Sequence, residues 1–218
     1  MQNNFKYILL DWDGCLADTL GVWMNSYLTV YEKHGKSVSP ADILKHSWGN
    51  VEKGPKEIGI SDSDICWKEI ILKVKEGIMK VPLHNFAKEL LKRLHGKQFK
   101  IAIVTSSEKS LIQPALAHHN LNKFIDFLIT EEEVSHPKPN PEMLNTAIKY
   151  LNGNKSESII IGDSSKDILA GHNAGIASAL VLHKENNKYY DFNVLEQTNP
   201  QYIFYHLKQL YEFLILTK

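Results

Sequence analysis

The chain has few cysteines, no excess of either charge and no long apolar run. Its 218 residues include two cysteines, Cys15 and Cys66, so there is no disulfide framework and we expect a reducing compartment. Lys and Arg together number 25, as do Asp and Glu, which argues against a nucleic-acid partner because such a partner requires a basic face. The apolar stretches are far shorter than a membrane span and no secretory signal pattern opens the sequence, so we expect a cytoplasmic protein without a membrane partner.

Hydrophobic residues make up 43% of the chain, which is enough for one packed core and a small accessory unit. Three short apolar stretches predict buried strands, and each ends in small hydroxyl or acidic residues. They are 8–10, followed by Asp-Trp-Asp-Gly at 11–14; 100–104, followed by Thr-Ser-Ser at 105–107; and 158–161, followed by Gly-Asp-Ser-Ser-Lys-Asp at 162–167. Helical patterns lie between the stretches. This order predicts an open parallel α/β sheet, whose ligands bind at the carboxyl ends of the strands.

Asp11 and Asp13 stand two residues apart where the first predicted strand ends. A regular strand would put both on one face, but the chain is turning there. Burying two carboxylates is costly unless a cation or hydrogen-bond donors neutralise them, and Mg²⁺, which prefers oxygen ligands, would fit. A solvated Asp-Gly turn explains the same residues, so this run by itself leaves both interpretations open.

Four motifs, in order along the chain, resemble those of the haloacid dehalogenase superfamily of phosphotransferases. They are Asp-x-Asp-Gly at 11–14, Thr105 after an apolar strand, Lys138 in a proline-rich loop, and Gly-Asp-Ser-x-x-Asp at 162–167. The resemblance covers residues 7–182 and implies a Rossmann-like parallel sheet core with an inserted all-helical cap domain. We therefore expect a catalytic core at 1–19 and 82–218 and a helical cap at 20–81.

Helical spacing within 20–81 supports this division. Pro40 is expected to begin a helix with Ser39 as its N-cap, and a longer helix is expected at 65–79. Such a cap would close over the site and exclude water, whereas a helical subdomain packed rigidly on the sheet is the alternative. Near the end of the chain, 203–214 predict a final helix. It would pack on the core or form a dimer contact, so a monomer and a homodimer both remain open.

The resemblance implies a role for each motif. Asp11 would be the nucleophile that forms an aspartyl-phosphate, and Asp13 would be the general acid and base. Thr105 would donate to a phosphate oxygen, and Lys138 would place fixed positive charge beside Asp11. The acid at Asp13 favours phosphoryl transfer over carbon–halogen cleavage, because the dehalogenases of the superfamily lack one there. Without the resemblance, Thr105 would be taken as part of an ordinary helix N-cap and Lys138 as a solvated loop residue.

The resemblance also implies a Mg²⁺ ion held by Asp11, the backbone carbonyl of Asp13, and Asp163. Asp167 belongs to the same predicted group, where it would orient a metal-bound water or Lys138. A carboxylate that only stabilises the start of a helix is the alternative for Asp167. The residues expected to bind the substrate are Gly14, Ser106 and Ser107 in the core and Lys53 and Lys56 in the cap.

These features predict a Mg²⁺-dependent phosphatase that hydrolyses a small phosphate monoester, similar to phosphoglycolate phosphatases and β-phosphoglucomutases. A sugar-phosphate mutase is the first alternative, because it shares the core motifs. Mutases of this kind carry Glu-Asp at the last motif, whereas this chain has Gly162-Asp163, which favours hydrolysis. A non-catalytic regulatory protein that binds metal or phosphate is the second alternative, and the intact Asp11, Asp13 and Lys138 argue against it.

Overall fold

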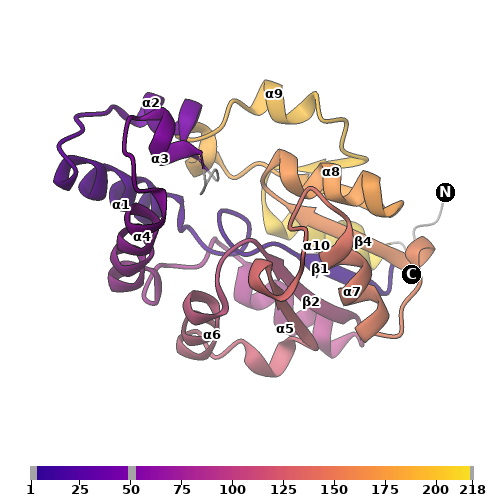
Figure 1. Cartoon of the computed structure of the whole chain (residues 1–218). Helices are drawn as coiled ribbons and strands as arrows, with labels where there is room; N and C mark the ends of the chain where they lie inside the picture. Colours follow the sequence, from indigo (N-terminus) through magenta and orange to yellow (C-terminus); the bar gives the residue numbers. More distant parts are fainter. Residues whose placement is uncertain (1–3, 49–52, 217–218) are drawn as a thin grey trace. The chain divides into compact units, whose positions relative to one another are not determined.

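The computed structural model describes residues 4–48 and 53–216, which form two compact units (Figure 1). The core unit comprises the chain up to Asp18 and from Pro82 onward, and the helical unit comprises Thr19–Val81. The chain thus leaves the core unit soon after its first strand and returns to it after the helical unit.

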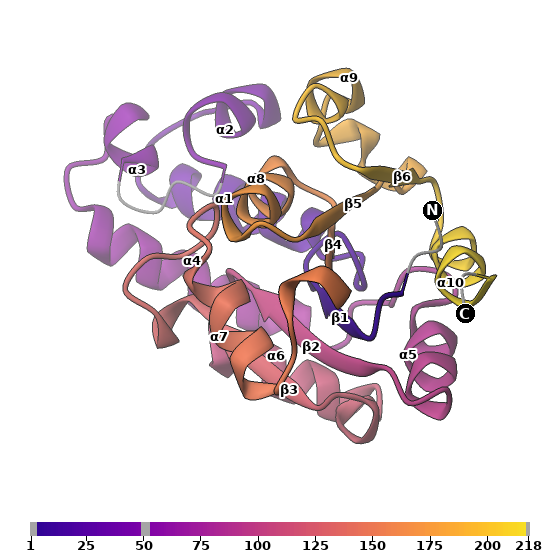
Figure 2. The same ribbon diagram turned by 90° about the vertical axis from the view of Figure 1, so that its right-hand side faces the viewer.

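The core unit contains a six-stranded parallel sheet in the order β3-β2-β1-β4-β5-β6 (Figure 2). Its strands are β1 (Tyr7–Leu10), β2 (Lys100–Thr105), β3 (Phe127–Thr130), β4 (Ser158–Gly162), β5 (Ala177–Val181) and β6 (Tyr202–Phe204). The predicted parallel α/β sheet is confirmed, and the three predicted strands are β1, β2 and β4. Because β1 lies between β2 and β4, the strand order reverses there. A crevice at the carboxyl ends of these three strands is where open α/β sheets bind ligands.

Helices cover both faces of the sheet (Figure 2). They are α5 (Ala87–Gly96), α6 (Lys109–His118), α7 (Glu142–Tyr150), α8 (Ser165–Ala174), α9 (Phe192–Glu196) and α10 (Leu207–Leu216), with short 3₁₀ turns η1 (Asn122–Phe124), η2 (Glu131–Glu133), η3 (Lys155–Glu157) and η4 (Lys184–Lys188). On one face, Leu9 of β1 and Ile160 of β4 pack with Met143 and Ala147 of α7 and Ala170 of α8. Strands covered on both faces read as unbroken apolar runs, which is why β1 and β4 were recognisable in the sequence.

The predicted helix at 203–214 is wrong at its start. Tyr202–Phe204 forms strand β6, which pairs with β5, and α10 begins only at Leu207. An aromatic and β-branched run favours an edge strand, and Ile203 had matched the helical spacing by coincidence. Leu207, Leu210 and the other apolar side chains on the inner face of α10 are buried, and α10 packs on α5 and β6. The core-packing alternative for this helix is therefore the one observed within the chain.

The helical unit consists of α1 (Leu20–Lys33), α2 (Pro40–His46), α3 (Gly54–Glu57) and α4 (Ser63–Ile78) among its described residues. Helices α1 and α4 pack together, and the Trp23 and Trp67 rings stack with their centroids 5.9 Å apart. As predicted, Ser39 caps α2, and its hydroxyl accepts a hydrogen bond from the Asp42 N–H. Helix α4 begins two residues earlier than predicted, because Asp62 is the residue whose side chain caps it.

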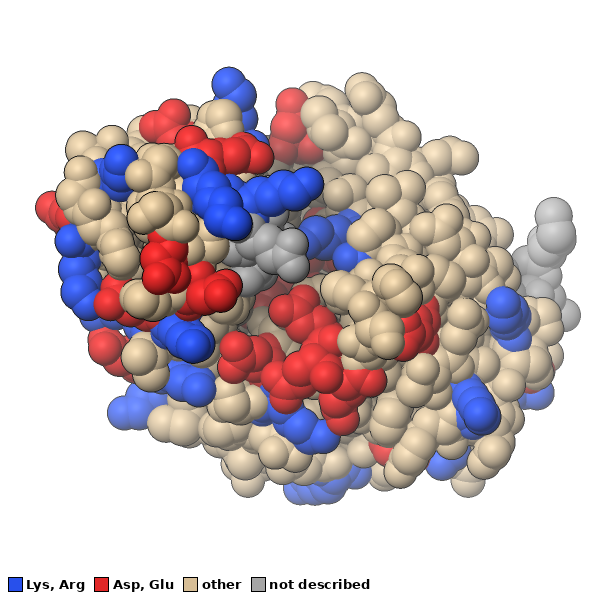
Figure 3. All heavy atoms as spheres, in the orientation of Figure 1, with Lys and Arg blue, Asp and Glu red and all other residues tan. Residues whose placement is uncertain are grey.

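The molecular face drawn in Figure 3 carries charged side chains of both signs. Acidic side chains form several groups, the largest of them near the centre of the view, and Lys and Arg side chains are scattered over the face in small groups. The described residues on this face therefore form no continuous basic surface. No helix within 4–48 or 53–216 combines the length and the apolar content needed to cross a bilayer.

Candidate active site

The polar residues that follow β1, β2 and β4 meet at the reversal of strand order. The Asp11 N–H donates to the Ile161 carbonyl at 2.9 Å, which extends the β1–β4 pairing by one residue and fixes the Asp11 backbone beside the end of β4. Asp163 follows β4 directly, and Thr105 is the last residue of β2. All three are buried, so the fold holds their side chains at the carboxyl edge of the sheet.

Lys138 joins two of the acidic side chains. Its ammonium group donates to Asp11 Oδ1 at 2.9 Å, to Asp167 Oδ1 at 2.6 Å and to the Val104 carbonyl at 2.9 Å, so all three of its hydrogens have acceptors. Burial opposes the charge of the Lys138 ammonium, but Asp11 and Asp167 outweigh it and raise the pKa of Lys138. The lysine is therefore a permanent cation at this site.

The site still holds more negative than positive charge. Carboxylate oxygens of Asp11, Asp163 and Asp167 lie within 4.8 Å of one another, and the Lys138 ammonium forms ion pairs with Asp11 and Asp167. Burial raises the pKa of Asp11 to about 7 against the opposing charge of Lys138. Burial and the neighbouring Asp11 also raise the pKa of Asp163 well above its ordinary value. A divalent cation bound there would favour the ionised forms of these carboxyl groups.

Asp163 also has an oxygen available for such a cation. Its Oδ2 accepts a hydrogen bond from Asn186 at 3.2 Å, whereas its buried Oδ1 has no hydrogen-bond partner among the described residues. A buried carboxylate oxygen without a partner is costly unless an ion or a water satisfies it. The donor set of Asp163 and Asp11 consists of hard oxygen atoms, which fits Mg²⁺.

Asp167 forms hydrogen bonds both to Lys138 and at the start of α8, which correspond to the two interpretations of this residue made from the sequence. One oxygen accepts from Lys138, and the other accepts from Ser164 Oγ at 2.6 Å and from the Ser164 N–H at 3.2 Å, which completes a capping box at the start of α8. Gly162 makes room for this arrangement, because a Cβ at that position would lie 2.2 Å from Asp167 Cγ. Asp167 therefore both bonds Lys138 and caps the N-terminus of α8.

The Asp13 side chain faces a different set of neighbours. It is half-buried, and its Oδ2 accepts from Ser107 Oγ at 2.6 Å and from Thr105 Oγ1 at 3.5 Å. The Ser107 N–H in turn donates to Thr105 Oγ1 at 3.1 Å, and Ser106 lies half-buried between these two residues. The ordinary N-cap interpretation of this segment is wrong, because α6 begins at Lys109 with Glu108 as its N-cap.

Residues 12–17, which we call the Asp-loop, form a compact turn after Asp11. Gly14 has a φ of 74°, a left-handed conformation that glycine adopts without strain, and its N–H donates to the Ala17 carbonyl at 2.8 Å. Cys15 is buried in this turn, where burial and the nearby Asp11 raise the pKa of its thiol well above the ordinary value. A neutral buried thiol is a poor nucleophile, so the chemistry of the site rests on the carboxylates.

Three residues that contact this region were not anticipated. His84 precedes α5, His183 follows β5, and Asn186 lies in η4. Nothing in their local sequence distinguishes them, because each reaches the Asp-loop only through the fold. Of the two expected cap residues, Lys53 is the N-cap of α3 and Lys56 lies within α3, and both are exposed in the helical unit. We had expected residues 48–56 to form a substrate-specificity loop between cap helices, and positions 49–52 of that segment lie outside the described residues.

Comparison with known proteins shows the family and the fold of this chain. The haloacid dehalogenase-like hydrolase family matches residues 8–181. The pyrophosphatase PpaX of Halalkalibacterium halodurans is 29% identical over 213 residues, which cover 90% of each chain.

Two solved structures share the fold. One is a haloacid dehalogenase family hydrolase from Deinococcus radiodurans with bound phosphate and sodium, with a TM-score of 0.80 at 18% identity over 99% of this chain and 97% of that one. The other is a β-phosphoglucomutase from Clostridium difficile, with a TM-score of 0.78 at 20% identity over 98% and 96% of the two chains. Because the family matches residues 8–181, which are most of this chain, the chain belongs to the haloacid dehalogenase-like hydrolases.

Proposed function

We propose that this protein is a Mg²⁺-dependent phosphatase that cleaves a small phosphate ester through an aspartyl-phosphate on Asp11. The observation that carries the proposal is the buried group of Asp11, Asp163 and Lys138 at the carboxyl edge of the sheet, in which Asp163 Oδ1 has no hydrogen-bond partner among the described residues. Bound there by Asp11, the Asp13 carbonyl and Asp163, Mg²⁺ would withdraw negative charge from the transferring phosphoryl group.

In the first step, a carboxylate oxygen of Asp11 attacks phosphorus in line with the leaving oxygen. A phosphorus–oxygen bond to Asp11 forms, the bond to the leaving group breaks, and Asp13 gives its proton to the departing alkoxide. Lys138 holds Asp11 through Oδ1 and offsets the negative charge of the phosphoryl group. Ser107 fixes the Asp13 carboxyl group through the 2.6 Å hydrogen bond to Oδ2. The protein thereby supplies both orientation and charge, which are the main needs of phosphoryl transfer.

In the second step, Asp13 takes a proton from water as the water oxygen attacks phosphorus. Phosphate leaves, Asp11 is regenerated as a carboxylate, and Asp13 is protonated for the next cycle. Thr105 and the backbone N–H group of Ser106 are proposed as donors to phosphate oxygens, whereas the Gly14 N–H already donates to the Ala17 carbonyl within the Asp-loop. We propose the helical unit, Thr19–Val81, as the cap that selects the substrate, with Lys53 and Lys56 as contacts for a second anionic group.

Inorganic pyrophosphate is a second candidate substrate, because the PpaX relative at 29% identity is named a pyrophosphatase. Pyrophosphate would use the same nucleophile, and its leaving group is phosphate, which needs less help from a general acid than an alkoxide does. Asp13→Asn should therefore slow formation of the aspartyl-phosphate from a monoester more than from pyrophosphate, whereas the second step, in which Asp13 is the base, should slow equally with both substrates. The sugar-phosphate mutase remains the alternative, and Gly162 in place of glutamate favours hydrolysis over it.

The test is phosphate release from pyrophosphate, 4-nitrophenyl phosphate and a panel of phosphorylated metabolites, in Mg²⁺ or EDTA. The variants are Asp11→Asn and the control Asp191→Asn, in which an exposed N-cap aspartate becomes a residue that caps equally well. We expect Mg²⁺-dependent turnover that only Asp11→Asn abolishes, and radiolabelled phosphate trapped on the wild type and on Asp191→Asn but not on Asp11→Asn. Turnover that persists in Asp11→Asn would overturn the mechanism. Conversion of a sugar phosphate to its isomer would favour the mutase, and no reaction with any compound would favour a regulatory protein.

A further inference from the structure

Three successive carbonyl groups of the Asp-loop accept hydrogen bonds from residues far away in the sequence. The Gly14 carbonyl accepts from Asn186 Nδ2 at 2.8 Å, and the Cys15 carbonyl accepts from His183 Nε2 at 2.9 Å. The Leu16 carbonyl accepts from the His84 N–H at 2.9 Å. The loop that carries Asp13 is therefore held on consecutive residues from outside, in addition to its own internal hydrogen bonds.

Asn186 links this loop to the proposed metal site. The residue is 1% exposed, and its side-chain amide donates both to the Gly14 carbonyl at 2.8 Å and to Asp163 Oδ2 at 3.2 Å. An amide nitrogen has two hydrogens, so both are used. One rigid group thus connects the chain after β1, which carries Asp13, with the carboxylate after β4.

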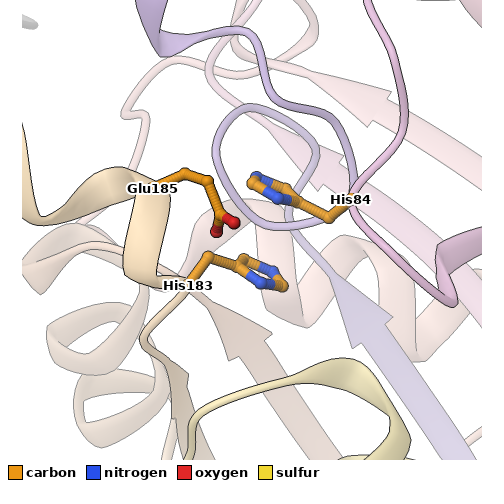
Figure 4. A group of neighbouring side chains, drawn as sticks. All are labelled: His84, His183 and Glu185. Carbon is orange, nitrogen blue, oxygen red and sulfur yellow. The ribbon is translucent and has the colours of Figure 1, made fainter.

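His84 and His183 form a stacked pair under the same loop (Figure 4). Their ring centroids are 3.7 Å apart and their planes differ by 5°, and both side chains are buried. Burial lowers the pKa of His84 to about 3 and also lowers the pKa of His183. Both rings are therefore neutral near pH 7, and His183 must carry its hydrogen on Nε2 to donate to the Cys15 carbonyl.

The same two rings and Glu185 could be taken for a metal site, since their ligand atoms lie within 4.8 Å of one another and the Glu185 carboxylate lies beside the rings (Figure 4). The stacking argues against it. An imidazole binds a metal in the plane of its ring at roughly 2.0–2.1 Å, so one ion cannot lie in two parallel planes that are this far apart. Moreover, His183 Nε2 is already bonded to a carbonyl. The pair is better explained as a neutral support for the loop.

We propose that Asn186 is a positioning residue that fixes Asp163 relative to the Asp-loop, and that the His84–His183 stack supports the same loop from below. The inference rests on the proposed function, because it assigns the geometry of that site to residues outside the family motifs. Residues that bond a metal ligand from outside typically change metal affinity or activity on the order of 10–100-fold when they are removed. Loss of the Asn186 amide should therefore loosen the loop and weaken the cation site together.

The experiment compares Asn186→Leu with Asn187→Leu. The two asparagines are adjacent in η4, but Asn187 is exposed, so the second variant is a matched control. We expect Asn186→Leu to speed hydrogen exchange at the amides of Gly14, Leu16 and Ala17, which are hydrogen-bonded within the loop, while amides of β2 and β3 keep their wild-type rates. Mg²⁺ affinity measured by calorimetry should fall roughly 10–100-fold, and kcat should fall with little change in KM.

Wild-type exchange in the loop together with wild-type Mg²⁺ affinity in Asn186→Leu would overturn the proposal. If Asn186→Leu does not fold, Asn186→Ser, which keeps a small polar side chain, takes its place with the same criteria. Exchange and metal binding need no substrate, so they decide the proposal even if the wild type releases no phosphate, an outcome that would count against the proposed function alone. Binding of one Zn²⁺ per chain by the wild type and none by His84→Gln would overturn the role assigned to the stack.

Discussion

Replacing Lys138 with methionine should destabilise the protein by about 3–5 kcal/mol near pH 7.5 in the absence of a metal ion. The Lys138 side chain is 3% exposed, and its ammonium group is bonded to Asp11, Asp167 and the Val104 carbonyl. Methionine preserves much of the length and packing of the lysine stem while removing its charge. The two carboxylates then remain buried without their cation, and that uncompensated charge is the source of the cost.

The measurement is urea unfolding in EDTA, with Lys109→Met as the matched control. Lys109 also bonds a carboxylate, Glu133 at 2.9 Å, but these side chains are 40% and 35% exposed. An exposed pair contributes about 0–1 kcal/mol, so the control should lose little stability. A loss of under about 1 kcal/mol in Lys138→Met would refute the argument that buried charge dominates this site.

The pH dependence gives a second check on the same variant. In the wild type, burial raises the pKa of Asp11 to about 7 although Lys138 opposes the shift, so removal of the lysine should raise this pKa further. An acid whose pKa is higher in the folded state binds its proton more tightly there, so folding gains stability as the pH falls through that pKa. The stability difference between Lys138→Met and the wild type should therefore shrink from pH 8 to pH 5. A difference that grows over this range would contradict the electrostatic reasoning.

Three further changes test other parts of the site. Gly162→Ala would place a Cβ 2.2 Å from Asp167 Cγ, so calorimetry should show a loss of roughly 1–3 kcal/mol, and an unchanged melting temperature would count against this contact. Ser107→Ala removes the 2.6 Å hydrogen bond to Asp13, so kcat should fall about tenfold or more, and an unaltered kcat would separate this serine from the chemistry. His84 has a pKa of about 3 against an ordinary 6.5, so below pH 6.5 the unfolded chain binds a proton that the folded chain does not. The wild type should accordingly lose about 2 kcal/mol more than His84→Gln between pH 7 and pH 5, and equal losses in urea unfolding would refute the assignment.

The sequence predicted the parts of the fold whose cause is local. Strand β1 is an unbroken apolar run that ends in aspartate, and Ser39-Pro40 is a helix start that needs no tertiary contact to be recognised. Strand β6 was taken as part of a helix, because three residues at the edge of a sheet carry too short a pattern to establish a period of two. Its pairing with β5 decides its conformation, and that pairing is set by the rest of the sheet.

The residues of the candidate site likewise fall into two groups, those that the sequence predicted and those that it did not. Asp11 and Asp163 were predicted because each follows an apolar stretch, whereas Lys138 was predicted only from the order of the family's motifs. Asn186 and His183 carry no such signal, since they reach the Asp-loop through contacts that span 172 and 168 positions of sequence. Contacts of this length depend on how the whole sheet is assembled, so a residue can hold the proposed catalytic loop without belonging to any recognisable motif.

Asp11 and Asp13 lie in different surroundings because the chain turns between them. Asp11 still follows the β1–β4 pairing and lies in the buried group with Lys138, whereas Asp13 belongs to the Asp-loop and faces the hydroxyls of Thr105 and Ser107. A nucleophile needs to be ionised and fixed beside a cation, while a general acid needs a partly solvated surrounding in which its proton can be exchanged. A regular strand would have placed both carboxylates in one environment. The end of β1 at Leu10 and the left-handed Gly14 therefore give two residues of one short motif different surroundings, as the roles proposed for them require.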